Sequence, residues 1–394
     1  MAVMADREWT HSAKRLRTLA GRVLERGGSP LPAEERAALY ARLSGKPVYL
    51  LGSTTGIARR FIQVAARLFD VRGVVDDVSR ESTIQGIPRL DGGSFVARGA
   101  GAVAVCLAFS HPALEYFEHL CRAAGAELVQ YMEAVDAIPD YPRDHILASL
   151  ARTTAENIEL LLAASERWAD SISRHTYFAL LNGRLTYDRT WLESVDVGPE
   201  TMYFGVDCME LGPHEALVDC GAFDGDTIES FRAKTLDQFE SIVGLEPDPR
   251  NFAILNQRYG GDPRIKLHSV AASSEACELS FAAGLGAQSF SSAADGAQAQ
   301  EKIVVAAVDL DTLLECRPTV IKIDVEGGEP EVLEGARRTI EECRPRLTIA
   351  AYHRPLHLAE FPGWILSVAP GYRFYLRHHG GFFFETVLYG IPAG

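Results

Sequence analysis

The sequence predicts an α/β protein with two mostly parallel sheets, the second closed by an antiparallel hairpin. Apolar strand patterns alternate with helical patterns over residues 46–135 and again from residue 216 onward, as in parallel sheets built from βαβ units. Both stretches contain a strand, a glycine loop and a helix start, at Gly52–Gly56 and Gly221–Gly225. Two strand patterns within 372–391 flank a double glycine, which indicates a hairpin.

The domain organisation follows from length and pattern. The 394 residues exceed one ordinary hydrophobic core. We expect a helical lead-in at 1–44, a smaller Rossmann-like α/β domain at 45–140, a helical linker at 141–205 and a larger α/β domain at 206–394.

The elements are expected where apolar runs or helical spacing occur between glycine and proline signals. In the smaller domain we expect strands at 47–51, 71–75, 101–109 and 127–131, and helices at 57–69 and 111–124. One long helical stretch is expected at 145–182, followed by an irregular segment at 187–211. In the larger domain we expect strands at 216–219, 242–246, 265–270, 278–282, 303–308, 319–324, 346–352, 372–378 and 383–391. Helices are expected near 227–235, 249–259, 309–315 and 329–343, and a mobile loop at 284–300.

The composition excludes some classes of partner. With 53 acidic and 39 basic residues the net charge is −14, which argues against a nucleic-acid partner and against docking to anionic membranes. Seven scattered cysteines without a CxxC pair indicate free thiols in a reducing compartment. The first residues contain no apolar signal-peptide core, so the cytoplasm is the expected location.

The loop after the strand at 216–219 favours a cationic cofactor. A dinucleotide site needs a second glycine two residues after the first, and Phe223 stands there. Asp219, Asp224 and Asp226 have no base among them, and each would repel a pyrophosphate at a cost of roughly a kcal/mol. S-adenosylmethionine has the opposite preference, because carboxylates stabilise its sulfonium and ammonium charges.

Glu246 is the second cofactor signal. It ends the next strand, where a carboxylate can accept hydrogen bonds from ribose hydroxyls. Pro247, Asp248 and Pro249 then start a helix, so the alternative role for Glu246 is to cap that helix.

Several segments in a fixed order resemble one known family. They are MYFGVDCMELGPHEALVDCGAFDGDTIESF, GLEPDPRNFAIL, IKIDVEGGEPEVLEGA, AAYHRPLHL and FYLRHHGG. The stretch from about residue 200 to 391 resembles the FkbM family of S-adenosylmethionine-dependent methyltransferases. The resemblance implies a class I methyltransferase domain over 206–394 and O-methylation of a hydroxyl on a sugar, polyketide or related metabolite.

The resemblance also implies roles for individual residues. The donor-binding loop falls on Asp219, Gly221, Ala222, Phe223 and Gly225, and the ribose-binding acid on Glu246. We add Asp226, Thr227 and Pro247 to the cofactor contacts, with Ala271 facing the adenine. Asp324 and Glu326 match the motif beside the transferred methyl group.

The reacting side is expected at the ends of the next two strands. Asp324 ends one strand, and Tyr352 and His353 end the following one. A histidine with a pKa near neutrality suits the removal of a hydroxyl proton, so Asp324 and His353 are the predicted catalytic residues. The alternative is a structural histidine. Glu326, Tyr352 and Arg354 are the predicted acceptor contacts.

Three features on this side leave alternatives open. Lys322 lies within a buried strand and needs either an ion pair or a path to the sheet edge. His353 and His357 have a metal-ligand spacing, but Pro355 argues against one helix. A divalent metal held with Asp324 and Glu326 is the alternative, and no metal is expected. Arg354, Arg377, His378 and His379 either line the acceptor mouth or lie on the solvated surface.

The smaller domain offers a second loop. Gly52–Gly56 and Asp76 hint at a nucleotide site but lack the full dinucleotide pattern, and the domain could instead serve dimerisation or frame the acceptor pocket. The rival functions are a nicotinamide-dependent oxidoreductase and a non-catalytic nucleotide-sugar-binding protein. The expected partner is a small hydroxylated acceptor, and a homodimer stays an open alternative.

Overall fold

The chain divides into two compact units. The computed structural model describes residues 2–143, 146–282 and 302–393. Unit 1 comprises Met1–Ile158 and Leu181–Glu193, and unit 2 comprises Glu159–Leu180 and Ser194–Gly394. The expected loop at 284–300 lies outside the described residues.

Unit 1 contains a six-stranded sheet in the order β3-β4-β2-β1-β5-β6, with the β3–β4 pair antiparallel and the other pairs parallel. Its strands are β1 (Val48–Leu51), β2 (Val71–Val75), β3 (Thr83–Ile84), β4 (Ile87–Leu90), β5 (Val103–Cys106) and β6 (Glu127–Gln130). Its helices include α1 (Ala2–Glu25), α2 (Ala33–Gly45), α3 (Gly56–Leu68), α4 (Gly92–Arg98), α5 (His111–Ala124), α6 (Tyr131–Ala137) and α7 (Ile146–Glu156). The predicted strands are confirmed, whereas β3, β4 and α4 were not predicted.

The helical stretch predicted at 145–182 is confirmed, but it is divided into several helices. The chain forms α7, α8 (Ile158–Ala164), a 3₁₀ turn (Ser165–Arg167) and α9 (Ser171–Thr186). Trp168 and Ala169 are extended beside Phe374, whose carbonyl accepts a hydrogen bond from the Ala169 N–H. Asp170 then accepts a hydrogen bond from the Ser173 N–H at 2.7 Å. An N-terminal acceptor of this kind starts a new helix.

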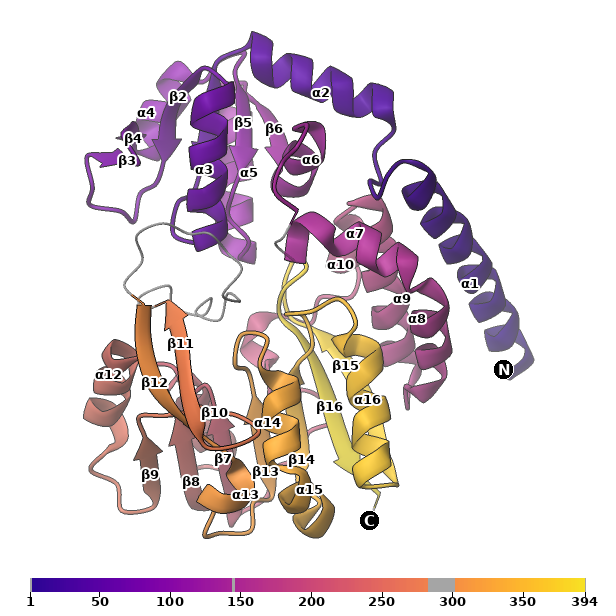
Figure 1. Cartoon of the computed structure of the whole chain (residues 1–394), viewed down its shortest axis with the longest axis vertical. Helices are drawn as coiled ribbons and strands as arrows, with labels where there is room; N and C mark the ends of the chain where they lie inside the picture. The colour runs from indigo at the N-terminus through magenta and orange to yellow at the C-terminus, as the bar shows by residue number, and fades with distance from the viewer. Residues whose placement is uncertain (1, 144–145, 283–301, 394) are drawn as a thin grey trace. The chain divides into compact units, whose positions relative to one another are not determined.

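Unit 2 contains a seven-stranded sheet in the order β15-β16-β14-β13-β7-β8-β9 (Figure 1). Its strands are β7 (Glu215–Cys220), β8 (Phe239–Leu245), β9 (Ile265–His268), β13 (Val320–Ile323), β14 (Arg346–Ala350), β15 (Tyr372–His378) and β16 (Thr386–Pro392). The β14-β13-β7-β8-β9 run is parallel, and β16 is antiparallel to both of its neighbours. The mostly parallel sheet with a closing hairpin is confirmed.

The helices of unit 2 include α11 (Asp226–Lys234), α12 (Pro249–Tyr259), α13 (Leu310–Leu313), α14 (Glu329–Gly335), α15 (Arg337–Cys343) and α16 (His357–Val368). A separate three-stranded sheet joins β10 (Ala271–Ala272), β12 (Lys302–Val308) and β11 (Cys277–Ala282). Two short helical segments, α10 (Thr190–Glu193) in unit 1 and a 3₁₀ turn (Pro199–Thr201) in unit 2, fall in the segment expected to be irregular. A core of Leu217, Ile228, Phe231, Ile242 and Leu255 lies between β7, β8 and these helices.

Three boundaries differ from the prediction. The helix expected at 309–315 is a single turn. The helix expected at 329–343 breaks at Ala336, because the Asp311 carboxylate accepts hydrogen bonds from the N–H groups of Arg338 and Thr339, both at 2.8 Å, and so caps α15 separately. The last strand begins at Thr386 and not at residue 383, directly after Glu385, which has a left-handed φ of 63°.

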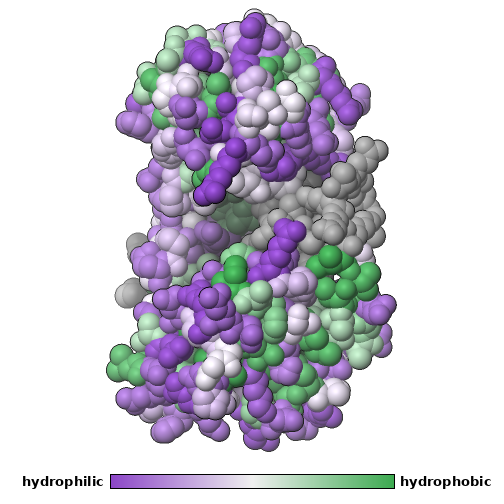
Figure 2. Space-filling view, turned by 90° about the vertical axis from the view of Figure 1, so that its left-hand side faces the viewer, coloured by the Kyte–Doolittle hydropathy of each residue, from purple (hydrophilic) through white to green (hydrophobic). Residues whose placement is uncertain are grey.

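Side chains at the surface are mixed in character. Hydrophilic residues cover most of the face shown in Figure 2, with smaller hydrophobic areas between them, as is normal for folded proteins. All seven cysteines are free, as expected. Among the described residues, every helix is too short or too polar to cross a bilayer.

Candidate active site

The glycine loop of unit 2 has glycine at two positions where a side chain would collide with neighbouring atoms. Gly221 follows β7 with a φ of 82°, and a Cβ atom there would lie 1.9 Å from the carbonyl oxygen of Asp324. Gly225 has a φ of 92°, and its Cβ would lie 2.3 Å from the Tyr259 ring. Between them, Ala222 is buried, whereas Phe223 is 37% exposed with a φ of 48°. The loop therefore brings its backbone against the end of β13.

Asp219 and Lys322 form a buried ion pair beneath this loop. They are register partners on β7 and β13, and Lys322 Nζ lies 3.1 Å from Asp219 Oδ1. Lys322 also donates a hydrogen bond to the Gly221 carbonyl at 2.6 Å. Burial raises the pKa of Asp219 to about 6 despite the lysine. Of the two alternatives for Lys322, the structure shows the ion pair and not a path to the sheet edge. The Asp219 side chain, which is fully buried, supports the loop from below.

The loop contains no base, but two bases from other parts of the chain lie close to its acids. Arg258 of α12 lies 3.4 Å from Asp224 Oδ1, and Lys322 neutralises Asp219. Asp226 is exposed, and its Oδ1 accepts a hydrogen bond from the Thr227 N–H at 2.7 Å. These bases come from distant parts of the chain, so the local sequence could not show them.

Glu246 connects the glycine loop to α12. Its Oε2 accepts a hydrogen bond from the Phe223 N–H at 2.9 Å, and its Oε1 accepts one from the Asp248 N–H at 2.8 Å. Asp248, not Glu246, caps α12. Burial raises the pKa of Glu246 to about 7. Pro247 between these two acids is half-buried.

Ala271 lies in β10 and is buried with Val305 and Ala307 in the core of the small sheet. Its methyl group therefore packs against other apolar side chains, which gives no support for the predicted contact with an adenine ring.

Two tyrosine hydroxyl groups lie close to Asp324 at the carboxyl end of β13. Tyr203 donates a hydrogen bond to Asp324 Oδ2 at 2.5 Å, and the Tyr352 hydroxyl lies 3.4 Å from the same oxygen. Tyr203 was not predicted, because it lies in a segment without a strand or helix pattern, far from Asp324 in sequence.

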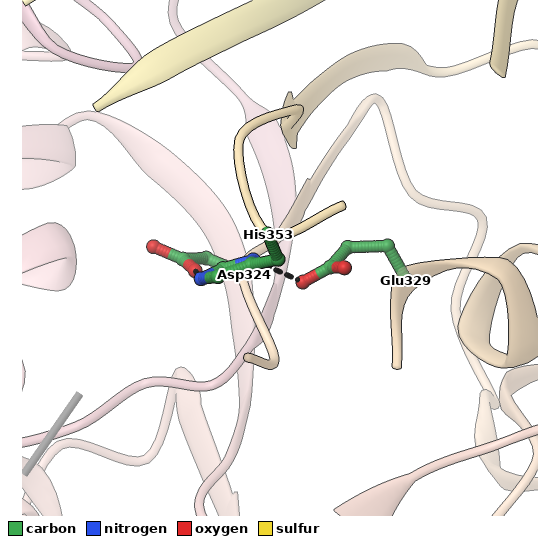
Figure 3. Close-up of side chains that lie close together, drawn as sticks. All are labelled: Asp324, Glu329 and His353. Carbon is green, nitrogen blue, oxygen red and sulfur yellow. Dashed lines mark hydrogen bonds and ion pairs between the residues drawn. The ribbon is translucent and has the colours of Figure 1, made fainter. Parts of the chain in front are cut away.

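His353 lies between carboxylates on two sides (Figure 3). Its Nδ1 is 2.8 Å from Glu329 Oε1, and its Nε2 is 3.3 Å from Glu326 Oε2 and 3.7 Å from Asp324 Oδ1. These carboxylates, Glu329 above all, raise the pKa of His353 well above its usual value although burial opposes this. The premise that His353 titrates near neutrality is therefore wrong, although a catalytic role stays a prediction. We call Asp324, Glu326, Glu329 and His353 the acid–histidine cluster.

Glu329 is the member of this cluster that the sequence did not reveal. It starts α14, is fully buried, and accepts hydrogen bonds from the N–H groups of Val325 and Gly327, both at 3.1 Å. The histidine charge and these bonds lower the pKa of Glu329 to about 2. The spacing of three acids after β13 was the available signal. His357, the other half of the metal-ligand spacing, begins α16 and lies 3.6 Å from Glu329 Oε2.

The basic residues proposed for the acceptor mouth divide into two groups. Arg354 is exposed. Arg377, His378 and His379 are buried, and Arg377 pairs with Asp170 and Asp207, both at 2.8 Å. Both sequence-based alternatives for these three residues, a mouth and a solvated surface, are wrong, because the hairpin is packed into the core of unit 2.

Unit 1 has a cavity of about 540 Å³ at the ends of β1 and β2. It is lined by Ser53, Thr54, Arg59, Asp76, Val78, Ser79, Arg80 and Glu81. Asp76 Oδ1 accepts hydrogen bonds from the N–H groups of Val78 and Ser79, at 3.0 Å and 2.8 Å, and Oδ2 accepts one from the Ser53 hydroxyl. The predicted nucleotide acid thus stabilises its own loop and joins it to the glycine loop through Ser53.

The strand order of unit 2 and the glycine loop at the end of its first strand define a class I methyltransferase fold. Residues 219–380 match the methyltransferase FkbM domain, so this C-terminal part of the chain is similar to the FkbM methyltransferases. The resemblance seen in the sequence is thereby confirmed.

Solved structures give the same result. Methyltransferase FkbM from Methylobacillus flagellatus KT is 26% identical with a TM-score of 0.75, over 97% of this chain and 100% of that one. An rRNA methylase from Streptococcus thermophilus (10% identity, TM-score 0.29, 47% and 90% covered) and a fibrillarin from Aeropyrum pernix with bound S-adenosyl-L-methionine (13%, 0.30, 48% and 70%) are far less similar. No match was found among curated proteins.

Proposed function

We propose that the protein is an S-adenosylmethionine-dependent methyltransferase that methylates a hydroxyl of a small molecule such as a sugar or polyketide. One observation carries this proposal: the acid–histidine cluster lies at the ends of β13 and β14, and Asp324 also touches the glycine loop through its carbonyl oxygen. A nucleophile activated by the cluster would be beside a donor held by the loop.

The residues present fit S-adenosylmethionine. The carboxylates of Asp226, Glu246 and Asp324 at successive strand ends suit its ammonium, ribose hydroxyls and sulfonium, and the exposed ring of Phe223 offers an apolar contact. When bound, the cofactor supplies a methyl group on a positively charged sulfur, which keeps the electron pair of the broken bond. Asp219 and Lys322 would hold the loop in position.

The cluster suits an oxygen nucleophile because a hydroxyl must lose its proton as it forms the new bond to carbon. Negative charge at Asp324 and Glu326 favours that loss, and Tyr203 and Tyr352 orient Asp324 through their hydroxyls. Glu329 fixes the ring of His353. Arg354, exposed beside the cluster, and Tyr352 are the proposed acceptor contacts. The free cysteines fit action in the cytoplasm.

Calorimetric titration with S-adenosylhomocysteine and, separately, with NAD tests the cofactor. We expect binding of S-adenosylhomocysteine and a weakening of about tenfold in Asp226→Asn, because one charge facing the cofactor is lost. Binding of NAD alone would overturn the proposal in favour of an oxidoreductase. Transfer of a labelled methyl group to hydroxylated sugars, but not to matched deoxy sugars, would identify oxygen as the nucleophile; transfer only to amines would contradict it.

A further inference from the structure

We propose that Asp324, Glu326 and His353 bind one divalent transition-metal ion, with Glu329 as the residue that orients His353. Within the described residues, the ligand atoms of Asp324, Glu329 and His353 lie within 4.8 Å of one another. Glu329 in this group is hydrogen-bonded to His353 Nδ1, so we assign the third ligand to Glu326, whose Oε2 lies 3.3 Å from His353 Nε2. The binding of the ion stands on this geometry alone, whereas its role in methyl transfer rests on the proposed function.

The orientation of His353 favours a ligating nitrogen. Glu329 accepts from Nδ1 at 2.8 Å, which fixes the ring so that Nε2 faces Glu326 and Asp324, where a bound ion would replace the proton on Nε2. The side chain is 9% exposed, and in the part of the chain that the structure describes Nε2 makes no hydrogen bond of normal geometry. A carboxylate behind a histidine is the usual support of a histidine ligand to a metal.

Glu329 is held too firmly to move toward an ion. Its Oε1 accepts from two backbone N–H groups as well as from His353, and its side chain is fully buried. Glu326 is placed differently, because its backbone has a φ of 60°, a region that residues other than glycine rarely adopt. This turn directs the Glu326 carboxylate to the opposite nitrogen of His353. Backbone strain of this kind is concentrated at functional sites.

The distances and charges suit a cation. Two ligands at about 2.1 Å from one ion lie roughly 3 to 3.5 Å apart, close to the 3.3 Å and 3.7 Å that separate Nε2 from Glu326 and Asp324. Three carboxylates around one imidazole leave excess negative charge in a largely buried site, which is costly without a cation.

The ligand set selects the class of metal. One imidazole nitrogen with two carboxylates suits Mn²⁺, Fe²⁺ or Zn²⁺, whereas Mg²⁺ and Ca²⁺ prefer oxygen alone. If the proposed function holds, the ion lowers the pKa of the acceptor hydroxyl. That proton leaves to solvent, the oxygen bonds to the methyl carbon, and the electron pair of the broken bond stays on sulfur.

Titration of chelator-treated full-length protein with MnCl₂, with free Mn²⁺ followed by electron paramagnetic resonance, tests the site. We expect one ion per chain. Asp324→Asn and His353→Gln should each weaken binding by about 30-fold or more, and Glu329→Gln by about 10- to 100-fold. Glu331→Gln, an exposed acid on the same helix, is the matched control and should bind as the wild type does. Absence of binding to the wild type, or equal binding by His353→Gln, would overturn the site.

A second titration separates this proposal from the proposed function. The same metal-free protein is titrated with S-adenosylhomocysteine, and thermal unfolding is recorded for each variant as a folding control. Binding of S-adenosylhomocysteine with no Mn²⁺ binding would overturn the metal site and leave the methyltransferase intact. Mn²⁺ binding without any S-adenosylhomocysteine binding would support the metal site and overturn the proposed methyltransferase function.

Discussion

The two units contain the same strand, glycine loop and helix, yet the surroundings of the two loops differ. In unit 1, β1 leads through Gly52 into α3, and the acid after β2, Asp76, accepts hydrogen bonds from two N–H groups of its own loop and from the Ser53 hydroxyl of the glycine loop. In unit 2, β7 leads through Gly221 into α11, and the acid after β8, Glu246, reaches across to the Phe223 N–H.

The larger difference lies in the neighbouring strand. In unit 1 the strand β5 beside β1 continues into buried Leu107. In unit 2 the strand β13 beside β7 contains Lys322 and ends in Asp324. The comparison teaches that a glycine loop becomes a reactive site through polar residues on the adjacent strand, which the loop itself does not reveal.

The buried ion pair under the loop of unit 2 has no counterpart in the described strands β1 and β5 of unit 1, so its removal is the strongest test of the difference between the two loops. Lys322→Met should destabilise unit 2 by about 3 to 5 kcal/mol, because the buried Asp219 would lose its partner and would have to stay charged or take up a proton in an apolar site. The double variant Lys322→Met with Asp219→Leu should recover most of that loss. Thermal unfolding measures both. Equal stability of the single variant and the wild type would show that the pair carries no charge.

The two loop glycines sharpen the comparison. Gly221→Ala should cost about 3 kcal/mol, because its Cβ would collide with the Asp324 carbonyl in addition to the strain of its positive φ. Gly52→Ala has the same kind of φ, 92°, but its nearest neighbours are at 3.6 Å, so a cost of about 1 kcal/mol is expected. Melting temperatures decide this, and equal shifts would contradict the prediction.

Glu246 provides the third test, a pH dependence that is spread over more than two pH units. Its pKa is about 7 in the folded protein against the usual 4.5, so the folded state holds a proton that the unfolded chain has released. Stability contributed by this group therefore falls as the pH rises from about 4.5 to 7, by on the order of 3 kcal/mol.

Glu246→Gln should flatten this fall in denaturant unfolding measured across that pH range. It should also weaken S-adenosylhomocysteine binding, whereas Asp76→Asn, the matching change in unit 1, should leave that affinity unchanged. An unaltered pH slope in Glu246→Gln would remove this residue as the titrating group.

Much of the fold was predictable because it depends on local sequence patterns, namely apolar runs and the positions of glycines. Continuous apolar runs identified the buried strands β1, β5, β7 and β13, and the glycines before β16 indicated the hairpin. The break at Trp168 was not predictable, because it depends on pairing with Phe374 more than two hundred residues away. The two-residue strands β3 and β10 are too short to carry a pattern.

The site was predictable to the extent that parallel strands bring their ends together. Asp324 and His353 end neighbouring strands, and the structure places them side by side. The residues that contact Asp324 and His353 were not predicted from the sequence. Tyr203 comes from an irregular segment, and Glu329 reaches His353 from the start of a helix. The same limit applies to the bases near the loop, since Arg258 and Lys322 approach its acids only after folding.

The close approach of the Gly221 backbone to the Asp324 carbonyl oxygen, which leaves no room for a side chain, has one more consequence. It joins the loop proposed to hold the donor to the strand end that carries the proposed reacting groups through main-chain atoms. The main-chain spacing between these two parts of the proposed site therefore depends on the glycine. Diversification toward new acceptors would be confined to segments outside this joint, such as the turn that carries Arg354.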